Sequence, residues 1–254
     1  MKYRTIFLSD IHLGSKLCNS KSLLEFLKNN DSEYLILIGD IIDFWSLKRN
    51  SYWPQEHNTI IQKILKKSRH GTKVIFIPGN HDEALREYLG FSFGDITIYE
   101  EFIHTLKNRQ TILCLHGDKF DIVTQYHKWL AFIGDVGYNI LVDLNKLQNN
   151  LRTLFNLKQW SLSSYIKHNV KEVVSFIGDY EENVLNEAKK INVTGIFCGH
   201  IHHPELEIKE GIIYGNTGDF CETCSGIIET LEGNLEMFHW TNNEYVKMKE
   251  IICN

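Results

Sequence analysis

The chain contains no long uninterrupted apolar run and no excess of positive charge. No window reaches the roughly 18 consecutive apolar residues that a membrane-spanning helix needs, so we expect no such helix. The first residues lead directly into a strand-like run, and no apolar stretch near them is long enough for a signal peptide. The formal net charge is −5 and the pI is near 6.2, which argues against a nucleic-acid partner.

The chain also lacks the repeated cysteine pairs of a structural zinc site. Its six cysteines are scattered, and the pair Cys221 and Cys224 has no second pair to complete a four-thiolate site. A redox pair is the alternative, and we prefer a structural role. Cys114 and Cys198 lie within apolar runs, where a free thiol acts as a small hydrophobic side chain. These features predict a reduced, cytoplasmic protein.

Apolar runs of four to eight residues, rich in Ile and Val, predict buried strands. In the first part they alternate with helical segments near 20–30 and 57–69, the pattern of an α/β fold. Toward the C-terminus strands dominate, and residues 231–234 have the composition of a hairpin turn. The expected strands lie near 4–8, 34–38, 73–77, 96–99, 111–115, 194–198, 205–208, 212–214, 226–230 and 235–239.

The segment from about 122 to 175 has no strand pattern. From Trp129 to Leu154 its apolar residues recur at the three- and four-residue spacing of an amphipathic helix. It holds six Lys or Arg and three Asp or Glu, a local charge of +3, so the rest of the chain carries −8. Two compatible interpretations stay open: a helical subdomain packed on the core, or a lid that meets anionic lipid. We expect one domain over 1–254, with a helical insertion at about 122–190.

Five short polar clusters each follow an apolar run. They are Asp10-Ile11-His12, Gly39-Asp40, Gly79-Asn80-His81-Asp82, His116-Gly117-Asp118 and Gly199-His200-Ile201-His202. Ligands of open α/β sheets bind at the carboxyl ends of the strands, so the fold would gather these side chains at one rim. Carboxylate, imidazole and amide donors suit Mn²⁺, Fe²⁺ or Zn²⁺, and two such ions about 4 Å apart can clamp the oxygens of a displacement at phosphorus. One cluster alone is usually a cap or a turn, but five together predict a two-metal site, with Asp40 as the candidate bridge.

This series of clusters resembles the calcineurin-like metallophosphoesterase superfamily, over residues from about 3 to 220. The resemblance implies an α/β sandwich of two mixed sheets flanked by helices, with a helical lid insertion and a dinuclear site at the strand ends. It also implies that water activated by the metals attacks phosphorus, with no covalent phosphoenzyme. By position, the first metal would take Asp10, His12, Asp40 and His202, and the second would take Asp40, Asn80, His116 and His200.

The resemblance also implies roles for residues around the ligands. His81 and Asp82 are the candidate catalytic residues: His81 matches the histidine that assists the leaving group as a general acid or electrostatic stabiliser. Asp82 and Asp118 would orient neighbouring histidines. For Asp43 two alternatives are open, a carboxylate that caps its own loop or one that contacts a ligand from behind. His203 is expected to face away from the metals.

Finer features resemble the UDP-2,3-diacylglucosamine diphosphatase family of bacterial lipid A synthesis. They are the run 39–45, the helical insert, the run 199–204 and Asn216-Thr217-Gly218-Asp219. This implies hydrolysis of UDP-2,3-diacylglucosamine to UMP and 2,3-diacylglucosamine 1-phosphate, with the acyl chains in the lid. Mn²⁺ is the expected metal, with Fe²⁺ or Zn²⁺ as alternatives, and contact with the cytoplasmic face of the inner membrane is expected. The residues expected to contact sugar or phosphate are Asn80, Asp121, Lys167 and Lys171.

The resemblance departs at one position. The family carries Arg where this chain has His81, and histidine can give a proton near neutral pH whereas arginine cannot. This favours a divergent branch with a different or broader substrate. One alternative is therefore a soluble phosphodiesterase or phosphatase that acts on a nucleotide or a phosphoprotein. A further alternative is a metal-bearing scaffold that has lost catalysis.

Overall fold

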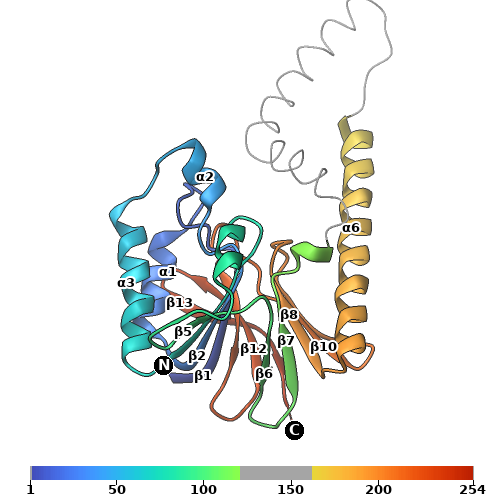
Figure 1. Ribbon diagram of the computed structural model, residues 1–254. Helices are drawn as coiled ribbons and strands as arrows, with labels where there is room; N and C mark the ends of the chain where they lie inside the picture. Colours follow the sequence, from blue (N-terminus) through green and yellow to red (C-terminus); the bar gives the residue numbers. More distant parts are fainter. Residues whose placement is uncertain (1, 121–161, 254) are drawn as a thin grey trace, which may run out of the picture. The chain divides into compact units, whose positions relative to one another are not determined.

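The computed structural model describes residues 2–120 and 162–253, and of residues 162–176 it describes the backbone alone. The chain divides into two compact units, and nearly all described elements belong to the first, Met1–Asp118 with Val184–Asn254. The second unit is Lys119–Asn183. The long helix α6 (Leu162–Ile191) begins in the second unit and ends in the first (Figure 1).

The larger sheet has eight strands among the described residues. Their order is β13 (Glu244–Ile251), β12 (Leu235–Thr241), β11 (Ser225–Glu229), β1 (Lys2–Leu8), β2 (Asp31–Ile38), β3 (Lys73–Ile77), β5 (Ile96–Ile98) and β4 (Ser92–Phe93). The strands β1, β2, β3 and β5 run parallel, and antiparallel strands continue the sheet on both sides. The parallel strands are covered on both faces, which explains their continuous apolar runs.

The smaller sheet has five strands in the described part of the chain. Their order is β6 (Phe102–Thr105), β7 (Thr111–Cys114), β8 (Gly195–Cys198), β10 (Ile212–Asn216) and β9 (Glu205–Lys209). The central strands β7, β8 and β10 run parallel, and the two edge strands are antiparallel to their neighbours. Both sheets are therefore mixed, as expected.

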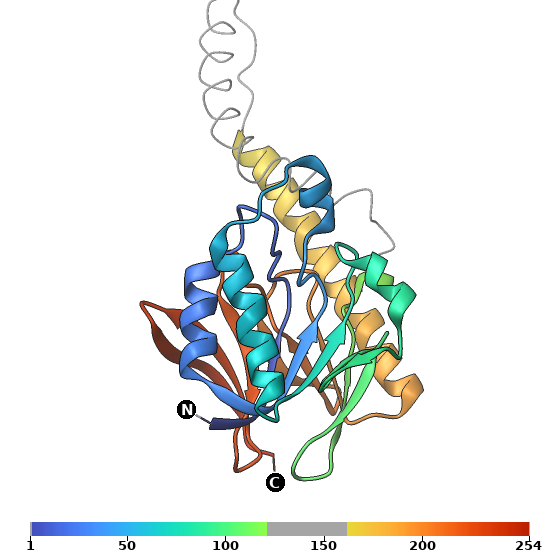
Figure 2. The same cartoon turned by 60° about the vertical axis from the view of Figure 1, so that its left-hand side comes forward.

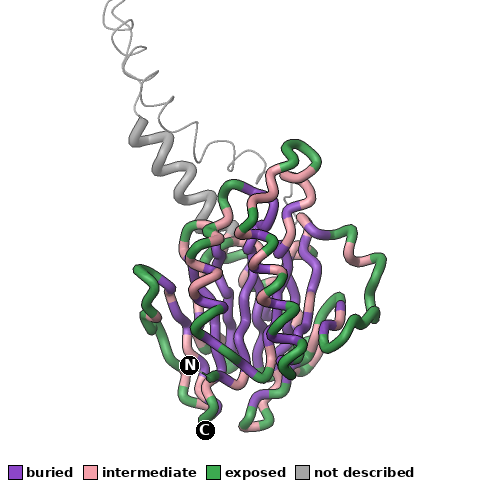
Figure 3. The backbone as a smooth tube through the Cα atoms, turned by 90° about the vertical axis from the view of Figure 1, so that its left-hand side faces the viewer, coloured by how far each residue is buried: buried purple, intermediate pink, exposed green. Residues whose placement is uncertain are grey.

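Alternation along β1 shows how the layers form. Ile6 and Leu8 belong to a core with α1 (Ser20–Asn29) and α3 (Gln55–Arg69), which cover the outer face of the larger sheet (Figure 2). Phe7 belongs to a second core, shared with side chains of the smaller sheet. Successive strand residues point to opposite faces, so one strand serves both cores. Figure 3 shows the mostly buried strands behind these helices, whose turns are in part exposed.

The expected strands and the helices near 20–30 and 57–69 are all found, with ends shifted by a few residues. Sequence reasoning missed the 3₁₀ helices η1 (Glu83–Tyr88) and η2 (Asp118–Phe120), as well as α2 (Phe44–Arg49), β4, β6 and β13. Most of these are short, and β13 is a mostly exposed edge strand. Of the expected insertion, residues 121–161 lie outside the described residues, so its extent stays a prediction.

None of the helices that the structure describes is long and apolar enough to cross a membrane.

Candidate metal centre

The predicted ligands lie in loops that follow the strands β1, β2 and β3 of the larger sheet and β7 and β8 of the smaller sheet. Asp10, Asp40, His116 and His200 each come two residues after the end of a strand. Backbone hydrogen bonds join these loops: the Asp10 N–H donates to the Gly39 carbonyl (3.0 Å), and the Gly199 N–H donates to the His116 carbonyl (3.1 Å). The loops therefore form one connected rim.

Five of the seven predicted ligands have a left-handed backbone. Their φ angles are 49° at Asp10, 54° at His12, 54° at Asp40, 70° at His200 and 52° at His202. Such angles are uncommon for residues other than glycine, and they persist only where the surrounding structure enforces them. Strain concentrated at these positions is typical of a functional site.

Two glycines allow the ligand loops to approach one another closely. A Cβ at Gly79 would lie 2.3 Å from Asp40 Oδ1, and a Cβ at Gly199 would lie 2.4 Å from Asp10 Oδ2. Both distances are far below van der Waals contact, so any larger residue would push a carboxylate aside. These glycines belong to the clusters because the site needs the space.

The first donor group consists of Asp10, His12 and His202, whose candidate ligand atoms all lie within 4.8 Å of one another. Asp10 Oδ1 lies 3.1 Å from His202 Nε2 and 3.9 Å from His12 Nε2. Burial would raise the pKa of Asp10, but His202 outweighs it and lowers that pKa to about 2. Burial alone would lower the pKa of His202, and Asp10 instead raises it to about 9.

Two buried atoms of this group fit a metal ion. In the described structure His12 Nε2 has no hydrogen-bond partner, and Asp10 Oδ1 has no well-aligned hydrogen bond besides its ion-pair contact with His202 Nε2. His12 Nδ1 lies 3.5 Å from Asp43 Oδ2, which favours a proton on Nδ1 and leaves Nε2 bare. An imidazole held from behind by a carboxylate is the usual arrangement of a histidine that binds a metal.

The second donor group consists of Asp40, His116 and His200. His116 Nε2 lies 3.3 Å from Asp40 Oδ2 and 3.3 Å from the Asn80 side-chain oxygen. His116 Nδ1 lies 2.9 Å from the Ile38 carbonyl and donates to it, so Nε2 faces the carboxylate. Burial would lower the pKa of His116, but Asp40 raises it to about 10. A cation bound here would displace that proton.

Asp43 fulfils both alternatives that the sequence left open. It caps α2, where its carboxylate accepts the Ser46 N–H (2.7 Å), and it also contacts two histidines. His81 Nδ1 lies 3.0 Å from Asp43 Oδ1, and the His81 ring lies against Trp45 with centroids 4.2 Å apart. Burial would lower the pKa of His81, but Asp43 and Asp40 raise it. Asp43 therefore orients His12 and His81 together.

Asp82 is placed differently from our expectation. Its fully buried carboxylate accepts backbone N–H groups rather than orienting a histidine: Gly79 (2.6 Å), Ile41 (2.8 Å), Ile42 (3.1 Å) and Asp40 (3.3 Å). The reason is local, because the loop after β2 turns its amides toward this side chain. Burial, together with the charge of Asp40, raises the pKa of Asp82 to about 6. Asp82 fixes the loop that carries Asp40.

Asp118 also differs from expectation, because it forms an ion pair with Arg86. Both carboxylate oxygens accept from Arg86 Nη2, at 3.0 and 2.8 Å. Sequence reasoning missed Arg86, which lies on η1 four residues after Asp82, the last residue of its cluster. This pair links the loop after β3 to the loop after β7.

Asp10 is supported by residues that sequence reasoning gave no role. The Ser9 hydroxyl donates to Asp10 Oδ2 (2.5 Å) and accepts from Thr217 Oγ1 (2.6 Å). Asp219 Oδ2 lies 3.9 Å from His202 Nδ1. Ser9 directly precedes Asp10, and Thr217 and Asp219 belong to one quoted motif, so adjacency was the available signal. His203 is exposed, in keeping with a side chain away from the site.

The predicted substrate contacts can be followed only in part. Asn80 lies beside His116. Asp121 lies outside the described residues. Lys167 and Lys171 belong to the first part of α6, of which only the backbone is described. The role of these three residues remains a prediction.

The donors fit divalent ions, since carboxylates, imidazoles and an amide oxygen converge and no thiolate is among them. Residues 3–204 match the family described as calcineurin-like phosphoesterase. The chain belongs to this family. It is therefore a metal-dependent hydrolase, as the calcineurin-like pattern of its five clusters predicts.

Relatives of known name match most of the chain. The UDP-2,3-diacylglucosamine hydrolase of Haemophilus influenzae is 29% identical over 88% of this chain and 93% of its own. The enzyme of the same name from Chromohalobacter salexigens is 23% identical, over 80% of this chain and 81% of its own.

Solved structures share the fold. The phosphoesterase Yfce from E. coli has a TM-score of 0.51 at 16% identity, over 98% of this chain and 99% of its own. Vacuolar Protein Sorting 29 from Cryptosporidium parvum has a TM-score of 0.51 at 13% identity, over 97% and 96%. These likenesses confirm the two-sheet architecture.

Proposed function

We propose that this metallophosphoesterase hydrolyses UDP-2,3-diacylglucosamine to UMP and 2,3-diacylglucosamine 1-phosphate. The observation that carries the proposal is the pair of donor groups at the strand ends. Two further facts support this substrate. Relatives named UDP-2,3-diacylglucosamine hydrolase match the chain over most of both lengths. The segment between the fourth and fifth clusters is also long enough for a helical lid.

Asp40 is proposed to bridge two metal sites. Its Oδ2 lies 3.3 Å from His116 Nε2 in the second donor group and 4.0 Å from His12 Nε2 in the first. One carboxylate oxygen thus faces both groups. Two bound divalent ions would supply Lewis acidity and a water whose pKa is low enough to give hydroxide near neutral pH. Mn²⁺ is proposed, with Fe²⁺ and Zn²⁺ as alternatives.

His81 is proposed to assist the leaving group. Its Nδ1 is held by Asp43, its ring rests on Trp45, and its Nε2 lies 3.9 Å from Asp40 Oδ2, toward the site. The acidic neighbours Asp43 and Asp40 raise its pKa above the ordinary value of 6.5, which favours the protonated ring. A protonated imidazole in this position can donate to a departing phosphate oxygen or stabilise its charge.

Four residues are proposed to contact the substrate. Asn80 would contact phosphate, and Asp121, Lys167 and Lys171 would contact sugar or phosphate. The helical insertion would hold the acyl chains and touch the cytoplasmic face of the inner membrane.

A second candidate rests on His81. The resemblance to the UDP-2,3-diacylglucosamine diphosphatase family implies arginine at this position. A histidine, which can give a proton, suits leaving groups more basic than a nucleotide phosphate. The alternative is thus a metallophosphoesterase for a nucleotide or phosphoprotein substrate.

The test measures Mn²⁺-dependent release of UMP from UDP-2,3-diacylglucosamine, beside hydrolysis of bis-p-nitrophenyl phosphate by the same preparation. The Asp40→Ala variant is the control for contaminating hydrolases. UMP release that is absent from the variant supports the proposal. Hydrolysis of the artificial diester alone would reject the lipid substrate and keep the metal centre.

A further inference from the structure

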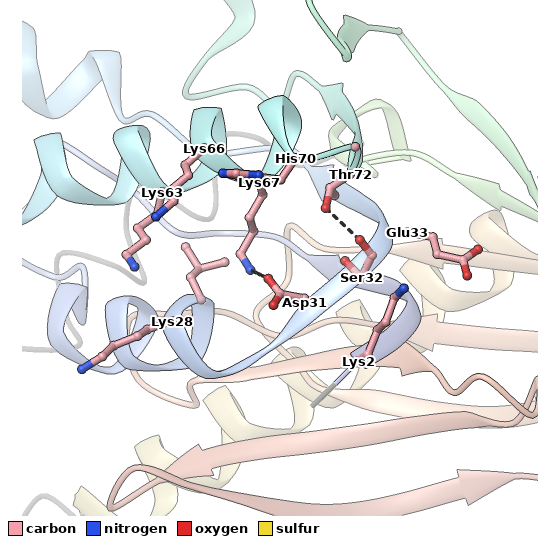
Figure 4. A pocket seen from close by; sticks show the side chains of 12 residues that line it. Lys2, Lys28, Asp31, Ser32, Glu33, Lys63, Lys66, Lys67, His70 and Thr72 are labelled. Carbon is pink, nitrogen blue, oxygen red and sulfur yellow. Dashed lines mark hydrogen bonds and ion pairs between the residues drawn. The ribbon is translucent and has the colours of Figure 1, made fainter.

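A cavity of about 540 Å³ lies at the N-terminal ends of β1 and β2, the ends opposite the metal centre (Figure 4). Its volume lies within the range of sites for small molecules. Residues from α1, α3, β1, β2 and the turn after α3 line it, among them Lys28, Asp31, Ser32, Lys63, Lys66 and Lys67.

This cavity is separate from the metal centre. The strand β2 begins in the cavity at Asp31 and ends at Ile38, two residues before Asp40. Eight strand residues span roughly 25 Å at about 3.3 Å per residue. A small ligand in the cavity therefore cannot touch the metal-binding side chains.

The lining is strongly basic. It contains five lysines and two acidic residues, a formal charge of +3 with His70 neutral, in a chain whose net charge is −5. Figure 4 shows Lys63, Lys66 and Lys67 on one helix, with Lys28 on the neighbouring helix. Like charges brought together around a concave surface favour an anion that neutralises them.

Lys67 is held in place before any ligand arrives. Its side chain is 8% exposed, and its ammonium donates to the Asn30 carbonyl (2.5 Å) and to Asp31 Oδ1 (2.6 Å). An ammonium has three N–H donors, so these two acceptors leave the third for a ligand. A fixed cation loses little conformational entropy when it binds.

Ser32 gives an independent sign of a ligand. Ser32 is 5% exposed, and its Oγ is buried without a hydrogen-bond partner in the described structure. The Ser32 backbone carbonyl, in contrast, accepts a hydrogen bond from Thr72 Oγ1 (2.8 Å). Nearly all buried hydroxyls are paired, so an unpaired one in a cavity wall needs an explanation. A ligand oxygen within reach would provide the partner.

We propose that this cavity binds a phosphate-bearing anion with two to three negative charges. Lys63, Lys66 and Lys67 pair with the phosphate oxygens, and the Ser32 hydroxyl donates to the ligand. Phosphate fits because several lysines around one anion act as point charges with many donors. The phosphate belongs to a small soluble molecule or to a lipid headgroup, and the experiment distinguishes these sources.

The test uses inorganic pyrophosphate, titrated calorimetrically into the metal-loaded protein. The double variant Lys63→Gln, Lys66→Gln is expected to weaken binding at the cavity at least tenfold. The double variant Lys247→Gln, Lys249→Gln on β13 removes the same charge elsewhere and should bind like the wild type. Equal affinities of the two double variants would overturn the proposal.

Pyrophosphate also has affinity for divalent ions, so a second arm locates the binding event. Asp40→Ala should retain the cavity event, because Asp40 lies at the other end of β2. Loss of all binding in Asp40→Ala would place the event at the metal centre and reject the cavity. Pyrophosphate binding at the cavity does not depend on whether the protein hydrolyses UDP-2,3-diacylglucosamine, so the two proposals can fail separately.

Ser32→Ala separates ligand binding from folding. Removal of an unpaired hydroxyl should leave the thermal midpoint without ligand unchanged or higher, while pyrophosphate binds several-fold more weakly. A lower midpoint with unchanged binding would contradict the role given to Ser32.

Vesicles identify the source of the phosphate. Sedimentation with phosphatidylglycerol vesicles but not phosphatidylcholine vesicles, reduced by Lys63→Gln, Lys66→Gln, supports a lipid headgroup. Tight pyrophosphate binding without sedimentation supports a soluble ligand. Absence of both would overturn the proposal.

Discussion

At the scale of the residue, single side chains at this site do two things at once. Asp43 caps a helix and orients two histidines, and Asp82 binds the backbone of the loop that carries Asp40. Sequence reasoning found the candidate ligands because they directly follow apolar strands. It could not assign Asp82 or Asp118, because a carboxylate's partner depends on which loop folds over it.

The two tasks of Asp43 can be separated. Asparagine is as good a helix cap as aspartate, so Asp43→Asn should keep the stability of the protein. It carries no charge to orient the two histidines, so kcat should fall about 10- to 100-fold. Kinetics, thermal unfolding and metal content together check this expectation. The matched control is Asn19→Ala, which removes only a cap from α1 and should cost about 1 kcal/mol with kcat unchanged. Full activity of Asp43→Asn would show that capping is its whole role.

Gly79 tests whether close packing sets the ligand positions. A Cβ there would lie 2.3 Å from Asp40 Oδ1 and 2.7 Å from the His116 ring, so Gly79→Ala should reduce bound metal and activity. Metal analysis of purified protein measures the effect. Gly178→Ala is the matched control, because no atom of the described residues lies within 4 Å of its added methyl group. Normal metal content in Gly79→Ala would show that the loops can move apart.

His81 acts on the leaving group in our proposal, so its effect should depend on the substrate. His81→Ala should slow hydrolysis of esters with poor leaving groups by about 100-fold or more, with metal content intact. The rate for esters of p-nitrophenol should fall much less, because p-nitrophenolate leaves without being protonated. Rates for a series of leaving groups provide the measurement. Equal losses across the series would be inconsistent with the role.

At the scale of the element, the parallel strands could be predicted from the sequence because both of their faces are buried. Their sequences are apolar almost throughout, whereas β4, β6 and α2 are short and have too little apolar pattern to recognise. The strand β13 was missed because its side chains are mostly exposed, so burial left no alternation in its sequence. The candidate ligands then follow the C-terminal ends of β1, β2, β3, β7 and β8.

Phe7 tests how strongly β1 joins the two layers. Its ring is fully buried between the sheets and lies edge-on to Phe197, with centroids 4.9 Å apart. Phe7→Ala should lower the free energy of unfolding by about 3–5 kcal/mol. Phe91→Ala, at a side chain that is 61% exposed, is the control and should change it little. Urea denaturation compares the two, and similar small losses would contradict a core shared by the sheets.

At the scale of the whole molecule, one buried carboxylate connects the two sheets away from the metal centre. Glu229 on β11 accepts from Arg4 (2.6 Å) and Thr5 (2.8 Å) on β1 and from the Lys107 N–H (2.8 Å), and it lies 3.3 Å from His104 on β6. The sequence offered no sign of this network, since its members are distant along the chain and belong to no motif. It was found only once the sheets were packed.

This network predicts how stability depends on pH. Burial would raise the pKa of Glu229, but His104, the Lys107 N–H, Arg4 and Thr5 outweigh it and lower that pKa below its ordinary value of 4.5. A carboxyl whose pKa is lower in the folded state stabilises the fold fully above its unfolded pKa. That contribution is lost as the pH falls through the folded pKa. The wild type should therefore lose stability below about pH 4.5 more steeply than Glu229→Gln, which has no charge to lose.

Urea denaturation of both proteins between about pH 7 and pH 3, in EDTA, isolates this effect, because acid also strips metal from the other end of the strands. At neutral pH Glu229→Gln should already be the less stable protein, since Arg4 and His104 lose their charged partner. The difference should shrink as the pH falls. Glu207→Gln, which breaks an exposed pair with Lys249, is the matched control and should follow the wild type. Parallel pH profiles for wild type and Glu229→Gln would mean that the sheets are held together by apolar packing alone.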